Sequence, residues 1–229
     1  MERTDNYAIQ AGMARQRFLS YDQEALIRKL GIPREDTWLS VTLLSTPYRI
    51  HRKTGEIQAF SGEKWQKTDD YATVMTLLDL ICDSREDRFL THRWKSMRDF
   101  GHQFHRQLLE KAGPWAEMFQ AQPDRFRKAC LSLGGKPLPQ GDIAYAIELF
   151  DGLEIAIQLW FGDEEFPPNL RLLWDENALM YLKYETMYFA KDLLLQRLGV
   201  FWIDDLLPFI LKGAPTGGAP FLIWWLGAQ

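Results

Sequence analysis

The stretch LWFGDEEFPPN, residues 159–169, sets three carboxylates in a row between an apolar run and two prolines. On an extended backbone alternate side chains share a side, so the first and third, Asp163 and Glu165, would point together. Asp175 follows after one short element, and Glu185 lies further along the chain. If the intervening elements fold back, all four side chains would converge. All-oxygen ligation of this kind suits Mg²⁺, Ca²⁺ or Mn²⁺.

The same carboxylates also fit structural roles. Asp175 stands where a helix N-cap would accept backbone N–H groups. Asp163 follows Gly162 and can close a turn in a similar way, and Glu165 can pair with an arginine such as Arg171. Structural anchoring, metal binding and contact with another ligand therefore remain three alternatives for this segment.

A histidine pair is the weaker metal candidate. His102 and His105, in GHQFHRQ, are three residues apart and would share a helical face. They supply only two ligands, and no HExxH pattern completes a metalloprotease site. A solvated or hydrogen-bonded surface pair is the alternative.

Other catalytic signatures are missing from the sequence. LGGKPLPQGD follows a predicted helix and lacks the spacing of a phosphate-binding loop, and GxGxxG and GxSxG do not occur. The two cysteines, Cys82 and Cys130, are far apart and form no metal-binding spacing. We expect both to be reduced thiols in a cytoplasmic protein, and the sequence indicates no particular cofactor.

Charge and hydropathy limit the partners. Lys and Arg number 27 and Asp and Glu 31, giving a net charge of −4. Nucleic acids and anionic membranes attract concentrated positive charge, so neither is expected as a partner. The N-terminus lacks an apolar signal-peptide region and no apolar run has the length of a membrane span. A small molecule remains a candidate partner.

The pattern of elements predicts an α+β fold. Two antiparallel strand groups, at about 37–60 and 142–174, are separated by runs with helical periodicity. The second group has a hairpin signal at Asp151-Gly152. We predict one α+β domain over residues 1–198 and a C-terminal extension over 199–229.

Several motifs resemble an uncharacterised prokaryotic family, a domain of unknown function found mostly in anaerobic bacteria and archaea. They are NYAIQAG, YRIH, RWKSMRDF, FHRQLLEKAGPWAEMFQ, LGGKPLPQGD and, most specifically, LWFGDEEFPPNLRLLWDENALMYLKYET. The resemblance covers about Asn6 to Leu198 and implies no activity. Some relatives have an extra cysteine-rich iron–sulfur segment, whereas this chain has only two cysteines.

Three functional hypotheses follow. The leading one is a non-catalytic accessory or small-ligand-binding domain, which the resemblance associates with anaerobic metabolism. The second is a carboxylate-dependent enzyme, with or without a divalent metal, in which Glu165 or Glu185 is the general acid–base. The third is a protein-interaction module that uses the apolar C-terminal tail, with a homo-oligomer as one outcome. The contact residues of the tail would be Phe221, Ile223, Trp224 and Trp225.

Overall fold

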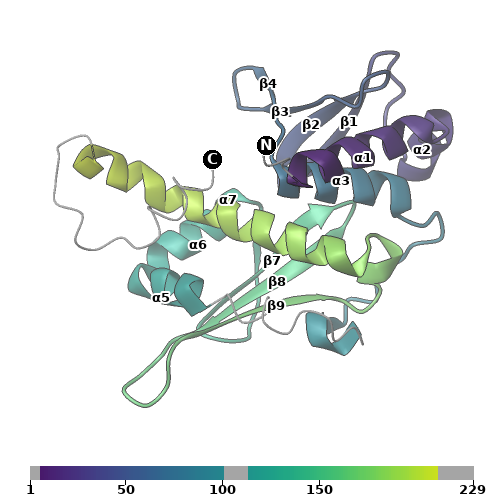
Figure 1. The fold of residues 1–229 in the computed structure, drawn as a ribbon. Helices are drawn as coiled ribbons and strands as arrows, with labels where there is room; N and C mark the ends of the chain where they lie inside the picture. Colours follow the sequence, from purple (N-terminus) through teal and green to yellow (C-terminus); the bar gives the residue numbers. More distant parts are fainter. Residues whose placement is uncertain (1–5, 101–112, 211–229) are drawn as a thin grey trace. The chain divides into compact units, whose positions relative to one another are not determined.

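The computed structural model describes residues 6–100 and 113–210. The chain divides into two compact units, Met1–Leu198 and Gly199–Gln229. The described part contains α-helices and two antiparallel sheets, so the predicted α+β class is confirmed (Figure 1).

Helix boundaries follow local signals in the sequence. The helices are α1 (Asn6–Ser20), α2 (Gln23–Leu30), α3 (Tyr71–Asp83), α5 (Gly113–Ala121), α6 (Pro123–Ser132) and α7 (Tyr184–Ile210). Asp22 caps α2 by accepting two backbone N–H groups, and Gly31 ends it with a φ of 63°. Pro123 begins α6, where a missing N–H has no cost. No helix in the described part combines the length and apolar character that a bilayer-spanning segment requires.

The first sheet is a four-stranded meander. Its strands are, in spatial order, β1 (Trp38–Leu43), β2 (Thr46–His51), β3 (Ile57–Phe60) and β4 (Trp65–Lys67). The predicted strand group ended at about residue 60, whereas β4 extends the sheet to Lys67. A strand of three residues is too short to show alternation, so the sequence carried no periodic signal for it.

The second sheet has five strands in the order β5-β9-β8-β7-β6. These are β5 (Trp94–Ser96), β6 (Lys136–Pro137), β7 (Ile143–Phe150), β8 (Leu153–Trp160) and β9 (Asn169–Asp175). The predicted β7–β8 hairpin is present, and its turn residues Asp151 and Gly152 have φ values of 50° and 79°. Both turn residues are therefore left-handed, as a tight hairpin turn requires.

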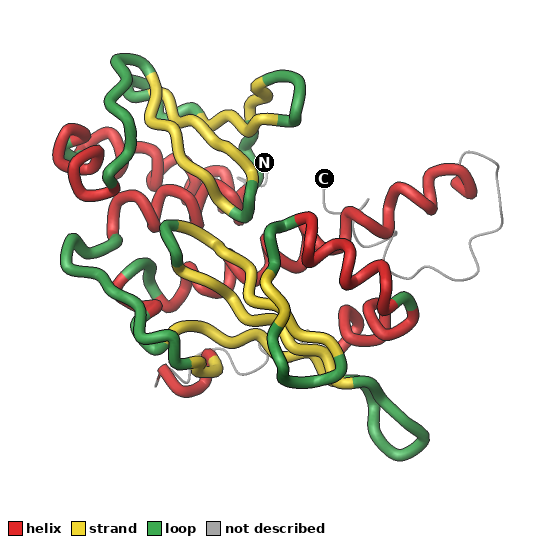
Figure 2. Tube along the Cα trace, turned by 180° about the vertical axis from the view of Figure 1, so that it is seen from behind, coloured by secondary structure: helices red, strands yellow, loops and turns green. Residues whose placement is uncertain are grey.

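Helices cover the two sheets. Helix α1 packs on α3 beside the four-stranded sheet, and the part of α7 through Leu198 lies across one face of the five-stranded sheet (Figures 1 and 2). The buried stripe of α7 includes Met187, Ala190, Leu194 and Leu198. The Leu44 N–H donates to the Leu149 carbonyl, which joins the β1–β2 turn to β7.

The segment after β9 differs from its predicted form. Asp175 is the last residue of β9, paired with Trp94 of β5, and is not a helix cap. Asn177 precedes a short 3₁₀ helix, Ala178–Met180, and α7 begins only at Tyr184. The carboxylate of Asp175 accepts hydrogen bonds from another loop, which accounts for the difference.

Candidate functional site

The acidic segment forms a closed turn. It belongs to the β8–β9 connection, residues 161–168, which extends beyond the end of the sheet (Figure 1). Asp163 Oδ1 accepts the N–H groups of Glu165 and Phe166, each at 2.8 Å, and Asp163 N–H donates to the Phe166 carbonyl at 2.9 Å. The expectation that Asp163 closes a turn is therefore confirmed.

The turn also fixes the ionisation of Asp163. The backbone N–H groups of Phe166 and Glu165 stabilise its carboxylate, so the pKa of Asp163 lies below its usual range. The carboxylate therefore stays negative to a lower pH than an ordinary aspartate while its Oδ1 holds the loop closed.

Two side chains from outside the connection hold its base. The Phe161 N–H donates to Asp142 Oδ2 at 2.7 Å, and the Gly162 N–H donates to Gln120 Oε1 on α5. A Cβ on Gly162 would lie 2.6 Å from the Pro168 nitrogen. Only glycine fits this position without a shift of the backbone.

The closed connection forms an open hollow of about 420 Å³, lined by Gln120 and by every residue from Gly162 to Pro168. Glu164 and Glu165 are exposed there, and neither has an ion-pair partner within the described residues. Phe166 is 67% exposed. Arg171 does not neutralise Glu165, because its guanidinium lies over the Trp160 ring at 5.0 Å. The hollow thus combines unpaired negative charge with an apolar wall.

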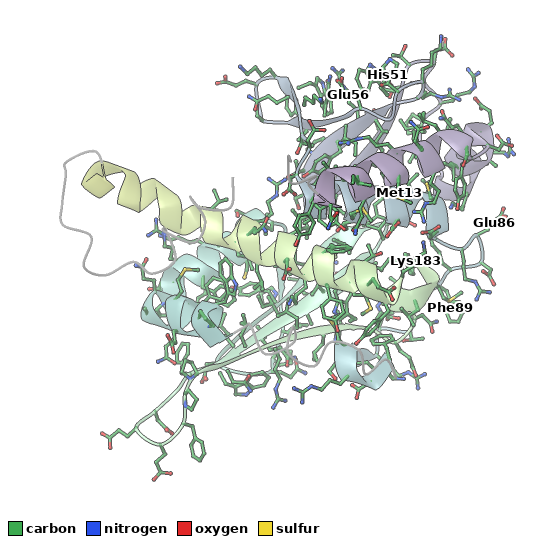
Figure 3. The ribbon with its side chains drawn as sticks, viewed as in Figure 1. Met13, His51, Glu56, Glu86, Phe89 and Lys183 are labelled. Atoms are coloured by element: carbon green, nitrogen blue, oxygen red, sulfur yellow. The ribbon has the colours of Figure 1, made fainter. Side chains whose placement is uncertain are left out.

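Asp175 is an internal anchor. Only 3% of this residue is exposed, and its carboxylate accepts the N–H groups of Thr91, His92 and Asn177 at 3.0, 2.6 and 2.8 Å. The Thr91 hydroxyl donates to the same group. These bonds hold the loop after α3, which includes Glu86 and Phe89 (Figure 3), against the end of β9.

The four predicted carboxylates do not meet. Asp163 and Glu165 precede β9 and Asp175 ends it, so a seven-residue strand separates them, a length of roughly 20 Å. Glu185 is exposed in the first turn of α7. No group of three His, Cys, Asp or Glu side chains in the described ranges is arranged to hold a metal ion. The histidine pair His102 and His105 lies outside those ranges, as do Phe221, Ile223, Trp224 and Trp225.

A second polar centre is buried among the helices. Asp79 of α3 is 5% exposed and accepts hydrogen bonds from Arg17 of α1 and from the Thr186 hydroxyl of α7. Asp83 pairs with Arg17 at 3.0 Å and with Lys183 at 2.9 Å. The buried carboxylate of Asp79 thus has one partner on α1 and one on α7, so the centre ties three helices together.

The cysteines are also internal. Burial raises the pKa of the Cys82 thiol to about 12, and burial alone raises the pKa of Cys130. A thiolate is the reactive form of cysteine, so neither thiol suits nucleophilic chemistry in the folded protein.

A stacked arginine stands out on the four-stranded sheet. The Arg49 guanidinium lies 4.3 Å from the Trp38 ring centre and 4.5 Å from that of Trp65. It also donates to Gln58 Oε1 at 2.9 and 2.6 Å. His51 packs edge-on against Trp38 at 5.0 Å, near one end of this sheet (Figure 3). The stack fixes the side chains of three strands relative to one another.

The sequence did not indicate Gln120, Asp142 or the Asp79 centre. Asp142 lies in the quoted motif LGGKPLPQGD, but its bond to Phe161 joins residues 19 positions apart. Gln120 reaches the connection across 42 positions. Such contacts depend on how elements pack, and no local pattern in a single sequence encodes them.

A family model, a domain of unknown function (DUF3786), matches residues 22–197. The chain belongs to this family. The DUF3786 match includes the acidic connection, its two hydrogen-bond acceptors Gln120 and Asp142, and the Asp175 anchor, while all of α1 precedes it. Comparison of this DUF3786 protein with curated proteins and with solved structures finds no match.

Proposed function

We propose that this protein is a non-catalytic accessory domain that binds a small cationic ligand at the β8–β9 hollow. One observation carries the proposal: a preformed hollow of about 420 Å³ presents unpaired carboxylates on a connection whose shape is already fixed. Small-molecule sites commonly measure roughly 300–1,000 Å³. A site ordered before binding also avoids the entropy cost of ordering its loop.

The lining residues favour an alkylammonium ligand. Glu164 and Glu165 offer carboxylates to an ammonium group, while Phe166, Pro167 and Pro168 offer apolar surface to its hydrocarbon chain. An ammonium can also approach the face of an exposed aromatic ring. A hard dication would need several oxygen atoms to converge on one point, and no group of three His, Cys, Asp or Glu side chains among the described residues is arranged in that way.

The carboxylates of Asp163 and Asp175 support a binding role over a catalytic one. A general acid or base must have a carboxyl oxygen within hydrogen-bond reach of the proton that it transfers. Asp163 precedes β9 and Asp175 ends it, and each has a carboxyl oxygen that accepts backbone N–H groups. The family resemblance adds the expectation that the domain serves anaerobic metabolism, and the two isolated cysteines add the expectation of a cytoplasmic location.

Isothermal titration at low salt tests the proposal. Spermidine and putrescine are the alkylammonium probes, and MgCl₂, MnCl₂ and CaCl₂ are the metal probes. We expect saturable spermidine binding that weakens roughly two- to twentyfold in the double variant Glu164→Gln, Glu165→Gln, since each exposed ion pair contributes modestly.

Glu86→Gln is the matched control, because it removes an exposed carboxylate from a different loop. It should bind spermidine as the wild type does. Absence of saturable binding to spermidine and putrescine, or an equal loss in the control, would refute the proposal. Binding of a metal alone would favour the divalent-cation alternative.

A further inference from the structure

We infer that Gln120 is a positioning residue for the β8–β9 hollow. Because its side-chain amide is neutral, it also keeps its side of the hollow uncharged. The inference rests on the proposed function, since it concerns the same site. Of the residues lining the hollow, Gln120 alone comes from a different element, the last turn of α5. It therefore connects the hollow to the folded body of the protein.

The contact between Gln120 and the connection is specific. Its Oε1 accepts the Gly162 N–H at the base of the hollow. An amide nitrogen in that position could not accept this bond, so the donor itself fixes the orientation of the side-chain amide. The Nε2 group makes no hydrogen bond within the described residues, and remains available as an uncharged donor.

The position of Gln120 is set by the core. On α5, Ala116 and Phe119 are fully buried, and the Phe119 ring stacks on Phe126 of α6 at 4.4 Å. Helix α5 also contacts both β8 and β9. A helix anchored in this way holds the side-chain Oε1 of Gln120 near Gly162 whether or not a ligand is bound.

Gln120 and Asp142 each accept one hydrogen bond at the base of the connection. They accept the N–H groups of two successive residues, Gly162 and Phe161, from two different segments. The two bonds restrain the base of the connection at two successive residues. Loss of the Gln120 bond frees the residue from which the hollow begins, so the carboxylates no longer stay in a common arrangement.

Two substitutions of Gln120 separate its hydrogen bond to Gly162 from its effect on the charge of the hollow. Gln120→Ala removes both the acceptor and the amide, whereas Gln120→Glu keeps an acceptor for Gly162 and adds a negative charge. Glu117→Ala is the control, because Glu117 is exposed one turn earlier on the same helix and does not line the hollow.

The measurements are spermidine titration at low salt and amide hydrogen exchange of Gly162 by NMR. For Gln120→Ala we expect faster exchange at Gly162 and affinity reduced about two- to tenfold, the usual effect of one lost hydrogen bond. For Gln120→Glu we expect protection of Gly162 as in the wild type, with spermidine bound at least as tightly. Glu117→Ala should change neither quantity.

A purely structural role for Gln120 would leave spermidine affinity unchanged in Gln120→Ala. Wild-type affinity in Gln120→Ala, or equal losses in both variants, would overturn the inference while leaving the proposed function intact. A wild-type protein that binds neither spermidine nor putrescine would overturn the proposed function itself, and Gly162 exchange would then report only on the Gln120 contact.

Discussion

One aspartate before β9 and one at its end both accept backbone N–H groups, but in different surroundings. Asp163 accepts two N–H groups from residues two and three positions ahead, on an exposed connection. Asp175 accepts N–H groups from residues more than 80 positions earlier, and it is 97% buried. The first shapes a local turn, while the second joins distant parts of the chain.

Burial changes the role of a carboxylate. Water can replace the carboxylate of Asp163 as an acceptor, since the turn is exposed. Water cannot readily replace Asp175, so its removal leaves buried donors unpaired at their full desolvation cost. The exposed turn around Asp163 therefore tolerates substitution and is accessible to a ligand, whereas the buried Asp175 contributes to the stability of the fold.

The largest effect should follow substitution of the buried anchor. Asp175→Ala would strand the N–H groups of Thr91, His92 and Asn177, and should destabilise the fold by about 3–5 kcal/mol. Urea unfolding measures this change. Asp175→Asn retains one acceptor and should cost less. A loss below about 1 kcal/mol in Asp175→Ala would contradict the assignment of Asp175 as an anchor.

An intermediate effect is expected at the base of the exposed connection. In Gly162→Ala the new Cβ would lie 2.6 Å from the Pro168 nitrogen and 2.7 Å from the Phe166 carbonyl oxygen. The backbone must shift, which should cost about 1–3 kcal/mol and weaken spermidine binding. Thermal unfolding and titration report the two quantities.

Gly12→Ala is the matched glycine control, because nothing lies within 4 Å of its added Cβ. In helix α1 this change should leave spermidine binding unchanged and raise stability by up to about 1 kcal/mol. If Gly162→Ala behaves in the same way, the connection is not closely packed.

The smallest effect should be the response of the turn to pH. The pKa of Asp163 is lowered in the folded protein, so its stabilising contribution is complete above the ordinary carboxyl pKa. It is lost only as pH falls through the lowered value. Amide exchange of Phe166, corrected for intrinsic rates, should therefore keep its protection until strongly acidic pH. Asp163→Asn should abolish this pH dependence, and an unchanged profile in that variant would contradict the assignment.

Sequence reasoning found the elements that local chemistry dictates. The Asp151-Gly152 turn lies where the sequence predicts it, and Gly31 and Pro123 mark helix ends in the same local manner, because each residue controls its own backbone. It also predicted the turn that Asp163 closes, since the residues involved are adjacent. The sequence did not predict the hydrogen bond from Gly162 to Gln120 or the burial of Asp175, because both depend on partners supplied by other elements.

The prediction that four carboxylates would converge was wrong for a related reason. Spacing along the chain shows which residues can share a strand face, but not whether a strand lies between them. Here β9 separates Asp163 from Asp175. The two strand groups were placed correctly, yet β4 and β5, of three residues each, were too short for a periodic signal.

The Asp79 centre has a consequence for the order of folding. Its carboxylate is completed by Thr186, 107 positions later in the chain. During synthesis, α1 and α3 can associate through Arg17, but one oxygen of Asp79 must stay hydrated until α7 emerges. Contacts between such distant residues slow folding, because a long loop must close before they form. The packing of α1, α3 and α7 around Asp79 is therefore completed only after the strands of the second sheet have been synthesised.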